Sequence, residues 1–344
     1  MNPFIYTALP TRVIFGRGKI SEVATEAMRL GMKNPLVITT KHQASSGLAI
    51  IKKSGGVAFA GAAMHTPSDV TEEALAVVSA EGCDGTIALG GGSSTGLGKA
   101  IALRTDLPQL VIPTSYAGSE MTNILGETAD GAKTTKRDSK IQPESVIYDA
   151  DLLDTLPDNF AATSGMNAIA HAVEGLYAVD GNPIISLMAE EGIRALATAL
   201  PKGKAGHDEA LYGAWLCATV LGSVSMALHH KLCHVLGGSF NLPHAETHTV
   251  ILPHATAYNS VGSPNAMGRI IRALGSKTAA AGLYELAQKL GAPLTLKELG
   301  MPEDGLDKAA NIAVANPYPN PRVLERAAIR QLLDDAYHGR RPQH

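Results

Sequence analysis

Short apolar runs alternate with helical patterns through the first 150 residues. Runs of four to six residues predict strands at residues 11–16, 36–39, 86–89 and 110–113. Between them, apolar residues three and four apart predict helices over residues 19–30 and 70–80. Because strands and helices alternate, we expect a doubly wound parallel sheet.

The pattern becomes helical beyond the break at Leu156 and Pro157. Helical spacing predicts helices over residues 184–200, 209–228, 279–290 and 323–336, with no convincing strand. A chain of 344 residues exceeds the usual size of one hydrophobic core. We therefore expect an α/β domain over residues 1–156 and an all-helical domain over residues 157–344.

Composition narrows the class of ligand. The chain carries 29 basic and 32 acidic side chains, without a long run of either charge. This near-neutral balance argues against nucleic acid or an anionic membrane as a partner and favours a small ligand. Neither a leader pattern nor an apolar run of about 18 residues occurs, so we expect no membrane span and a cytoplasmic location.

The three cysteines are scattered along the chain and form no CxxC pair. They are Cys83, Cys217 and Cys233. An odd number at these spacings predicts neither a disulfide framework nor a structural zinc site.

A glycine-rich stretch between two predicted strands is the clearest ligand signal of the first domain. Gly90, Gly91, Gly92 and Ser93 follow a buried strand and open a helix. This arrangement brings bare backbone amides and a helix dipole onto a phosphate, so we expect a pyrophosphate here. The stretch matches neither GxGxxG nor a Walker loop. A turn that only packs helix against strand is the alternative.

A second polar loop follows the next predicted strand. It supplies four hydroxyl residues, Thr114, Ser115, Ser119 and Thr122. Ligands collect at the carboxyl edge of open α/β sheets, so both loops predict one binding crevice. Lys133 is a further candidate phosphate contact, although alone it would be an ordinary surface lysine.

Histidines dominate the candidate chemistry of the second domain. His230 and His234 stand four residues apart on one predicted helical face, as do Asn167 and His171. The Gly237-Gly238 break is predicted to let the chain return His244 to the same place. Each imidazole alone is more often a core or surface residue. Together, the two clusters predict one polar pocket.

These motifs resemble the iron-containing alcohol dehydrogenase superfamily in order and spacing. They are Gly90 to Ser93, residues 113–122, residues 164–167 with His171, residues 230–234 with residues 243–244, and residues 316–318. The resemblance implies a dehydroquinate synthase-like fold, with an amino-terminal dinucleotide-binding domain and a helical domain carrying the substrate pocket. It also implies a nicotinamide cofactor and a homodimer.

Two departures from the superfamily pattern bear on metal and cofactor. The resemblance implies that metal-dependent members carry an aspartate at the position of Asn167, where it holds iron or zinc with residues matching His171, His230 and His244. Because a neutral amide leaves the dication uncompensated, we expect no metal. Thr40 stands where an aspartate often binds the adenosine ribose, so we expect either NADH or NADPH. Gly96 likewise replaces an aspartate.

Within the superfamily, the chain looks most like the maleylacetate reductases. The resemblance implies reduction of a carbon–carbon double bond of a small dicarboxylate, maleylacetate, to 3-oxoadipate in the degradation of aromatic compounds. Hydride addition builds charge on an enolate oxygen, which hydrogen-bond donors and a general acid stabilise. We expect His230, His234 and His244 to bind substrate or donate the proton. Asn167 and His171 would shape the pocket, and the remaining substrate contacts would be Tyr116, Lys231 and Tyr318.

Three other functions stay open at this stage. A metal-dependent alcohol or polyol dehydrogenase of the same superfamily would tolerate Asn167. A lyase resembling 3-dehydroquinate synthase needs a tight metal site and extra basic residues, which are not apparent. A nucleotide-binding regulatory module would need no convergent pocket in the second domain.

Overall fold

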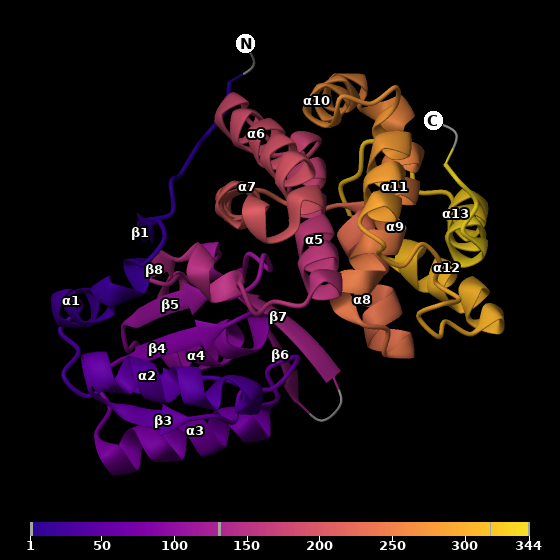
Figure 1. Cartoon of the computed structure of the whole chain (residues 1–344). Helices are drawn as coiled ribbons and strands as arrows, with labels where there is room; N and C mark the ends of the chain where they lie inside the picture. The colour runs from indigo at the N-terminus through magenta and orange to yellow at the C-terminus, as the bar shows by residue number, and fades with distance from the viewer. Residues whose placement is uncertain (1–2, 130–131, 317, 343–344) are drawn as a thin grey trace. The chain divides into compact units, whose positions relative to one another are not determined.

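The computed structural model describes residues 3–129, 132–316 and 318–342 (Figure 1). The chain divides into two compact units, Ala8–Leu156 and Pro157–His344, and the residues up to Thr7 cluster with the second unit. The division falls between Leu156 and Pro157, where the sequence pattern changes.

The first unit is built on a six-stranded sheet in which every pair of neighbours is parallel. The strand order is β1-β8-β5-β4-β2-β3. The strands are β1 (Arg12–Phe15), β2 (Leu36–Ile38), β3 (Val57–Phe59), β4 (Thr86–Gly90), β5 (Gln109–Pro113) and β8 (Ser145–Tyr148). The predicted doubly wound parallel sheet is therefore confirmed.

Apolar runs explain the four central strands. β2, β4, β5 and β8 are buried along their whole length, as expected of strands covered on both faces. Ile87 of β4 and Leu110 of β5 share one core cluster with Val23 and Ile50 from two helices. The helices of this unit are α1 (Val23–Arg29), α2 (Ala44–Ser54), α3 (Ser68–Glu81) and α4 (Gly92–Thr105).

Several elements of this unit were not predicted from the sequence. α2, the three-residue β3 and β8 were not predicted, and β3 is only partly buried. The strands β6 (Ile124–Ala129) and β7 (Ala132–Arg137) pair antiparallel as a separate two-stranded sheet. β7 reads Ala-Lys-Thr-Thr-Lys-Arg, so its pairing with β6 shapes the strand and no apolar periodicity announces it.

The second unit is helical throughout its described residues after Leu156. Its helices are α5 (Asp158–Leu176), α6 (Pro183–Ala199), α7 (His207–Ser223), α8 (Leu228–Phe240), α9 (His244–Asn259), α10 (Pro264–Leu274), α11 (Ala279–Lys289), α12 (Leu306–Ala315) and α13 (Arg326–His338). Leu232 of α8, Ile251 of α9, Ala310 of α12 and Leu333 of α13 belong to one core cluster. The predicted all-helical fold is confirmed for the residues described.

Two helix ends differ from the predictions for local reasons. α7 ends at Ser223, five residues early, because Val224 is extended and the Asp180 carboxylate accepts hydrogen bonds from the backbone and hydroxyl of Ser225. α13 begins at Arg326 rather than residue 323. Before it, the hydroxyl of Tyr258 donates to Val323 O and accepts from the backbone N–H of Glu325, which holds that segment out of the helix.

The predicted break at Gly237-Gly238 is wrong. α8 runs through both glycines to Phe240, and the chain turns instead at Asn241, whose φ is 54°. Asparagine tolerates this left-handed conformation better than most residues. The backbone N–H of Asn241 donates to Gly237 O, and α9 begins at His244 directly after Pro243. Asn241 therefore returns His244 towards α8.

Among the described residues, no single helix is long and apolar enough to cross a membrane. One bent pair, Pro183–Ser223 with Leu228–Phe240, passes the length and composition test only when joined across a bend of 92°.

The turn after β4 generates a stability prediction. Gly90 has φ 146°, and a Cβ there would lie 2.5 Å from Ser94 Oγ and 2.9 Å from Gln43 Oε1. We expect Gly90→Ala to lower the free energy of unfolding by about 1–3 kcal/mol, because both the backbone and the space oppose a side chain. Urea unfolding followed by circular dichroism measures it.

Gly92→Ala is the matched control, because nothing lies within 4 Å of its Cβ position. It should change the free energy of unfolding by no more than about 0.5 kcal/mol. Equal losses in both variants would contradict the assignment of strain to Gly90.

Candidate active site

The two loops predicted to bind phosphate lie side by side at the carboxyl ends of β4 and β5. Gly90 pairs with Pro113 in register, and Thr114 N donates to Gly90 O at 3.1 Å. A Cβ on Gly91 would lie 2.9 Å from Ser115 Oγ. The predicted convergence of the loops is therefore what the sheet produces.

The amino terminus of α4 has the features of an anion site. α4 begins at Gly92, which is exposed with open space around it, and its first turn contains no acidic residue. The strand order also reverses here, since β2 leads outward to β3 and β4 returns to the inner side of β2. Thr40 follows β2 and Gly91 follows β4, so both flank the switch point where open α/β sheets bind ligands.

The other predicted cofactor residues occupy different positions on these loops. Thr114 Oγ1 accepts a hydrogen bond from Gln43 Nε2 at 2.9 Å. Ser93, Ser115 and Ser119 are half-buried. The backbone of Lys133 lies on β7, and its side chain lies outside the described part of the structure.

A buried lysine that the sequence analysis missed organises the second loop. Lys99 on α4 is fully buried, and its Nζ donates to Ser119 O at 2.5 Å, Thr122 O at 2.6 Å, Thr122 Oγ1 at 2.8 Å and Ile124 O at 3.0 Å. Burial lowers the pKa of Lys99 to about 7, and Glu120 acts in the opposite direction. The hydroxyl of Thr122 is therefore already engaged. The sequence signal that could have revealed Lys99 is a lysine within a predicted helix of otherwise small and apolar residues.

Steric crowding, in addition to the loss of a negative charge, accounts for a glycine at position 96. A Cβ on Gly96 would lie 2.4 Å from Thr66 Oγ1. Thr66 is itself held in a left-handed conformation with φ 47° and accepts a hydrogen bond from Thr128 N through its carbonyl. A larger residue at position 96 would require Thr66 to move.

The two predicted substrate tyrosines belong to different units. Tyr116 follows β5 and is buried, and burial raises the pKa of its hydroxyl. In the helical unit, Lys231 Nζ lies 5.8 Å from the ring centroid of Tyr318, which is a cation–π contact. The Tyr318 hydroxyl is buried without a hydrogen-bond partner, and burial again raises its pKa.

Three helices bring six histidines together, which we call the histidine cluster. α5 supplies one, α8 three and α9 two: His171, His229, His230, His234, His244 and His248. Ring centroids are separated by 5.3 Å for His171 and His230, 6.4 Å for His230 and His234, and 4.3 Å for His244 and His248. The predicted grouping of histidines from these segments is present.

The cluster has a buried part and an exposed part. Asn167, His171 and His230 are buried, whereas His234 and His244 are exposed. Among the buried polar atoms here, Asn167 Oδ1, His171 Nδ1 and His230 Nε2 have no hydrogen-bond partner. Unpartnered buried polar atoms are costly, so their grouping in one place marks a site for a ligand.

Glu174, which the sequence analysis missed, fixes the geometry of this site. It lies one turn after His171 on α5 and is fully buried. Its carboxylate accepts from Ala227 N and His229 N, both at 2.8 Å, and from His230 Nδ1 at 2.7 Å. It thus replaces the absent side-chain cap at the start of α8 and holds His230 with Nδ1 as the donor. His230 Nε2 is left as the atom available to a ligand.

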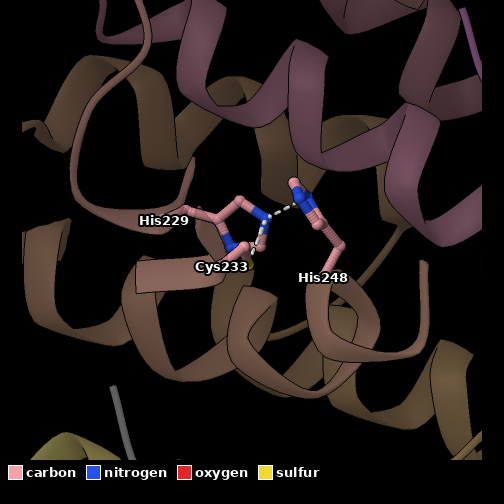
Figure 2. Close-up of side chains that lie close together, drawn as sticks. All are labelled: His229, Cys233 and His248. Carbon is pink, nitrogen blue, oxygen red and sulfur yellow. Dashed lines mark hydrogen bonds between the residues drawn. The ribbon is translucent and has the colours of Figure 1, made fainter. Parts of the chain in front are cut away.

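His229 and His248 are the other residues that the sequence analysis missed. His229 Nε2 lies 3.0 Å from His248 Nδ1, and Cys233 Sγ lies 3.7 Å from His229 Nε2 (Figure 2). His248 also lies near two pocket histidines, with ring centroids 4.9 Å from His230 and 4.3 Å from His244. His248 stands four residues after His244, so the same spacing that exposed the other pairs could have found it.

Burial sets the charge state of the inner imidazoles. Burial, assisted by the neighbouring imidazoles, holds the pKa of His171 and of His248 well below the usual range and lowers the pKa of His229 to about 3. Burial alone would raise the pKa of Glu174, but the hydrogen bond and charge of His230 outweigh it, and the pKa falls to about 2. At neutral pH the inner site holds neutral imidazoles beside one carboxylate.

The donor set of Asn167, His171, His230 and His244 fits a divalent cation poorly. It consists of three imidazoles and an amide, and none of these groups is negative at neutral pH. Glu174 is the nearest carboxylate, but its oxygens are occupied by α8 backbone N–H groups and by His230. A dication bound here would be compensated only through His230.

Two family models together match most of the chain. The iron-containing alcohol dehydrogenase model matches residues 10–150, and the carboxyl-terminal model of the Fe-containing alcohol dehydrogenase family matches residues 161–337. The chain belongs to the iron-containing alcohol dehydrogenase family. It is therefore an oxidoreductase. The resemblance stated from the motifs is confirmed.

Within the iron-containing alcohol dehydrogenase family, similar proteins are maleylacetate reductases. The chain is 53% identical to one from Burkholderia cepacia, covering 99% of this chain and all of that protein. It is 54% identical to a maleylacetate reductase from Sphingobium indicum, and the match covers 98% of this chain and 99% of that protein. The crystal structure of maleylacetate reductase from Agrobacterium tumefaciens matches with a TM-score of 0.96 at 52% identity, covering 99% of this chain and all of that one.

The buried Glu174 carboxylate generates a pH-dependent stability prediction. Its folded pKa of about 2 lies below the ordinary 4.5, so its contribution is complete above about pH 4.5 and is lost as pH falls towards 2. The shift corresponds to about 3 kcal/mol. We expect Glu174→Gln to lower the free energy of unfolding near pH 7, and the difference from wild type to shrink near pH 3. The single tryptophan, Trp215 in α7, reports the helical unit by fluorescence during urea unfolding.

Glu303→Gln is the control, because Glu303 is exposed in the same unit. It should change the free energy of unfolding by less than about 0.5 kcal/mol at both pH values. If the difference in the free energy of unfolding between wild type and Glu174→Gln stays constant with pH, the lowered pKa assigned to Glu174 is contradicted.

Proposed function

We propose that this protein reduces the carbon–carbon double bond of maleylacetate to 3-oxoadipate, in the degradation of aromatic compounds, without a metal ion. NADH or NADPH would be the hydride donor. The observation that supports this most is the neutral donor set at Asn167, His171, His230 and His244, in a chain about half identical to maleylacetate reductases.

The cofactor pyrophosphate is assigned to the amides of Gly90, Gly91, Gly92 and Ser93, at the open start of α4. Thr114, Ser115, Ser119 and Lys133 are the further proposed contacts. Thr122 acts by holding its loop, because Lys99 engages its hydroxyl. Thr40 presents no carboxylate to a 2′-phosphate, which supports acceptance of both cofactors. When bound, the reduced nicotinamide supplies the hydride.

We assign substrate binding and proton delivery to the histidine cluster. Hydride addition to the alkene carbon β to the ketone places negative charge on the ketone oxygen, which N–H donors stabilise. His171 and His230 are buried and act as positioned hydrogen-bonding groups with Asn167. His234 and His244 are exposed and exchange protons with water, so we assign proton delivery to one of these two.

Local charge suits a dicarboxylate substrate. Glu174, a carboxylate in contact with the histidine cluster, is buried, and its oxygens accept hydrogen bonds from α8 backbone N–H groups and from His230. Lys231 lies one residue after His230 and is held at the Tyr318 ring, where it can meet one substrate carboxylate. Tyr116 is a proposed substrate contact from the α/β unit. A homodimer and a cytoplasmic location complete the proposal.

Two alanine variants test the assignment of the proton donor. We expect His234→Ala or His244→Ala, whichever removes the donor, to lower kcat for maleylacetate by roughly 100-fold with little change in the Kd for NADH. Stopped-flow oxidation of NADH and fluorescence titration of the cofactor separate the two quantities. His338→Ala, on an exposed histidine of α13, is the control and should keep full kcat. Full kcat in both cluster variants would remove these residues from the reaction.

Metal dependence is tested on the wild type and on Asn167→Asp. We expect oxidation of NADH and NADPH by maleylacetate to survive treatment with a chelator. Asn167→Asp should bind Zn²⁺ at least ~10-fold more tightly, because it adds the missing anionic ligand, without gaining turnover of maleylacetate. Calorimetric titration and elemental analysis measure the binding.

The competing function is a metal-dependent alcohol dehydrogenase, since three imidazoles still converge. Loss of wild-type turnover on chelation, restored by added iron or zinc, would establish that competitor and overturn the metal-free proposal.

A further inference from the structure

Two members of the histidine cluster, His229 and His248, form a second group of metal-ligand side chains together with Cys233 (Figure 2). His229 and Cys233 lie one turn apart on α8, and His248 comes from α9. All three are buried, with at most 2% of any residue exposed. Two imidazoles and a thiol that face one another in this way are an unusual group for a protein core.

We propose that His229 Nε2, Cys233 Sγ and His248 Nδ1 bind a zinc ion. This site is separate from the donor set of Asn167, His171, His230 and His244, and it does not depend on the proposed reductase function.

The distances between donor atoms suit zinc. Bond lengths of about 2.0–2.1 Å to nitrogen and 2.3 Å to sulfur, at tetrahedral angles, place two nitrogens roughly 3.3 Å apart and nitrogen and sulfur roughly 3.6 Å apart. Here the nitrogens of His229 and His248 are 3.0 Å apart, the sulfur is 3.7 Å from His229 Nε2, and all three atoms lie within 4.8 Å. To hold zinc, the two ring nitrogens must separate by roughly 0.3 Å, and Cys233 Sγ and His248 Nδ1, which lie within 4.8 Å of each other, must come to roughly 3.6 Å. One coordination position is left for water.

Charge favours this group over the neighbouring donor set. Without metal, burial and the negative charge of Glu174 hold the pKa of the Cys233 thiol well above its usual range, so the sulfur keeps its proton. Zinc binding forms the Zn–S bond, breaks the S–H bond and releases that proton to solvent. The thiolate then offsets one of the two positive charges of the dication. The Asn167 donor set supplies no such anion.

The ligand types also select the ion. One thiolate with two imidazoles is a borderline-soft set that suits zinc and disfavours magnesium or calcium. The ion would join α8 to α9. It would also hold His248 against His230 and His244, whose ring centroids lie 4.9 Å and 4.3 Å away. The site is therefore a clamp behind the proposed substrate groups rather than a part of the chemistry.

Cobalt as a spectroscopic probe tests the proposal on the full chain. The protein is unfolded, stripped of metal and refolded with stoichiometric Co²⁺, because a buried site must load during folding. We expect a thiolate-to-cobalt charge-transfer band in the near ultraviolet, together with the visible bands of a tetrahedral ion. Cys233→Ser should abolish the charge-transfer band, and added Zn²⁺ should displace the cobalt.

Two controls separate the sites. Cys217→Ser removes another buried thiol, on α7, and should leave the band unchanged. His171→Ala disrupts the neighbouring donor set and should also leave it. A cobalt spectrum that lacks the sulfur band and depends on His171 would place the ion in the other set and overturn the proposal. Failure to retain cobalt would overturn it as well.

X-ray absorption spectroscopy at the zinc edge tests the wild-type protein, so its result does not depend on whether a variant folds. Protein refolded with Zn²⁺ should show one sulfur scatterer at about 2.3 Å beside nitrogen scatterers. A first shell without sulfur would refute the assignment of Cys233.

Discussion

The helical half depends on one buried carboxylate. Glu174 comes from the middle of the unit's core, yet its oxygens accept from the first backbone N–H groups of α8 and from the ring of His230. One anion therefore stabilises a helix start, fixes a side-chain tautomer and sets the angle at which α8 leaves the preceding loop. The positions of His230 and His234 follow from that helix start. Removing the carboxylate would take this acceptor from four buried donors, the backbone N–H groups of Ala227, His229 and His230 and the ring Nδ1 of His230.

A single anion among several imidazoles also decides the chemistry available there. Burial keeps His171, His229 and His248 neutral, so the inner cluster offers polar groups without adding positive charge. A dication in the Asn167 set would have to draw its compensation through His230 from a carboxylate that is already committed. An enolate oxygen requires only donors and a proton, which neutral and exposed imidazoles can supply. The charges around the site therefore distinguish metal-dependent chemistry from stabilisation of an enolate more clearly than the identity of the residues does.

Periodicity was sufficient where one apolar face or run decided the structure. It found the buried strands β4 and β5, the helices α6, α7 and α11, and the pairs at four-residue spacing. It failed at β3, a three-residue strand that is not fully buried, and at β7, a polar strand that pairs with β6. It also failed at Gly237, where glycine signalled a break but the helix continued, and Asn241 made the turn. Glycine permits a left-handed turn without requiring one, and that choice is made by the packing of α8 against α9.

The residues that support the site were harder to find than those that form it. Lys99 and Glu174 belong to different units, but they act alike: each is a fully buried charge whose hydrogen bonds go mainly to backbone groups of a segment distant in sequence. The sequence motifs lie on the loop or helix that each buried charge holds in place. The charged residue itself is not part of the motif, so a motif search misses it. Counting cysteines had the same weakness, because Cys233 has no cysteine partner and its neighbours are histidines on two helices. A buried charge or thiol in an apolar helix is therefore the sequence signal to follow, since burial is affordable only where the fold supplies its partners.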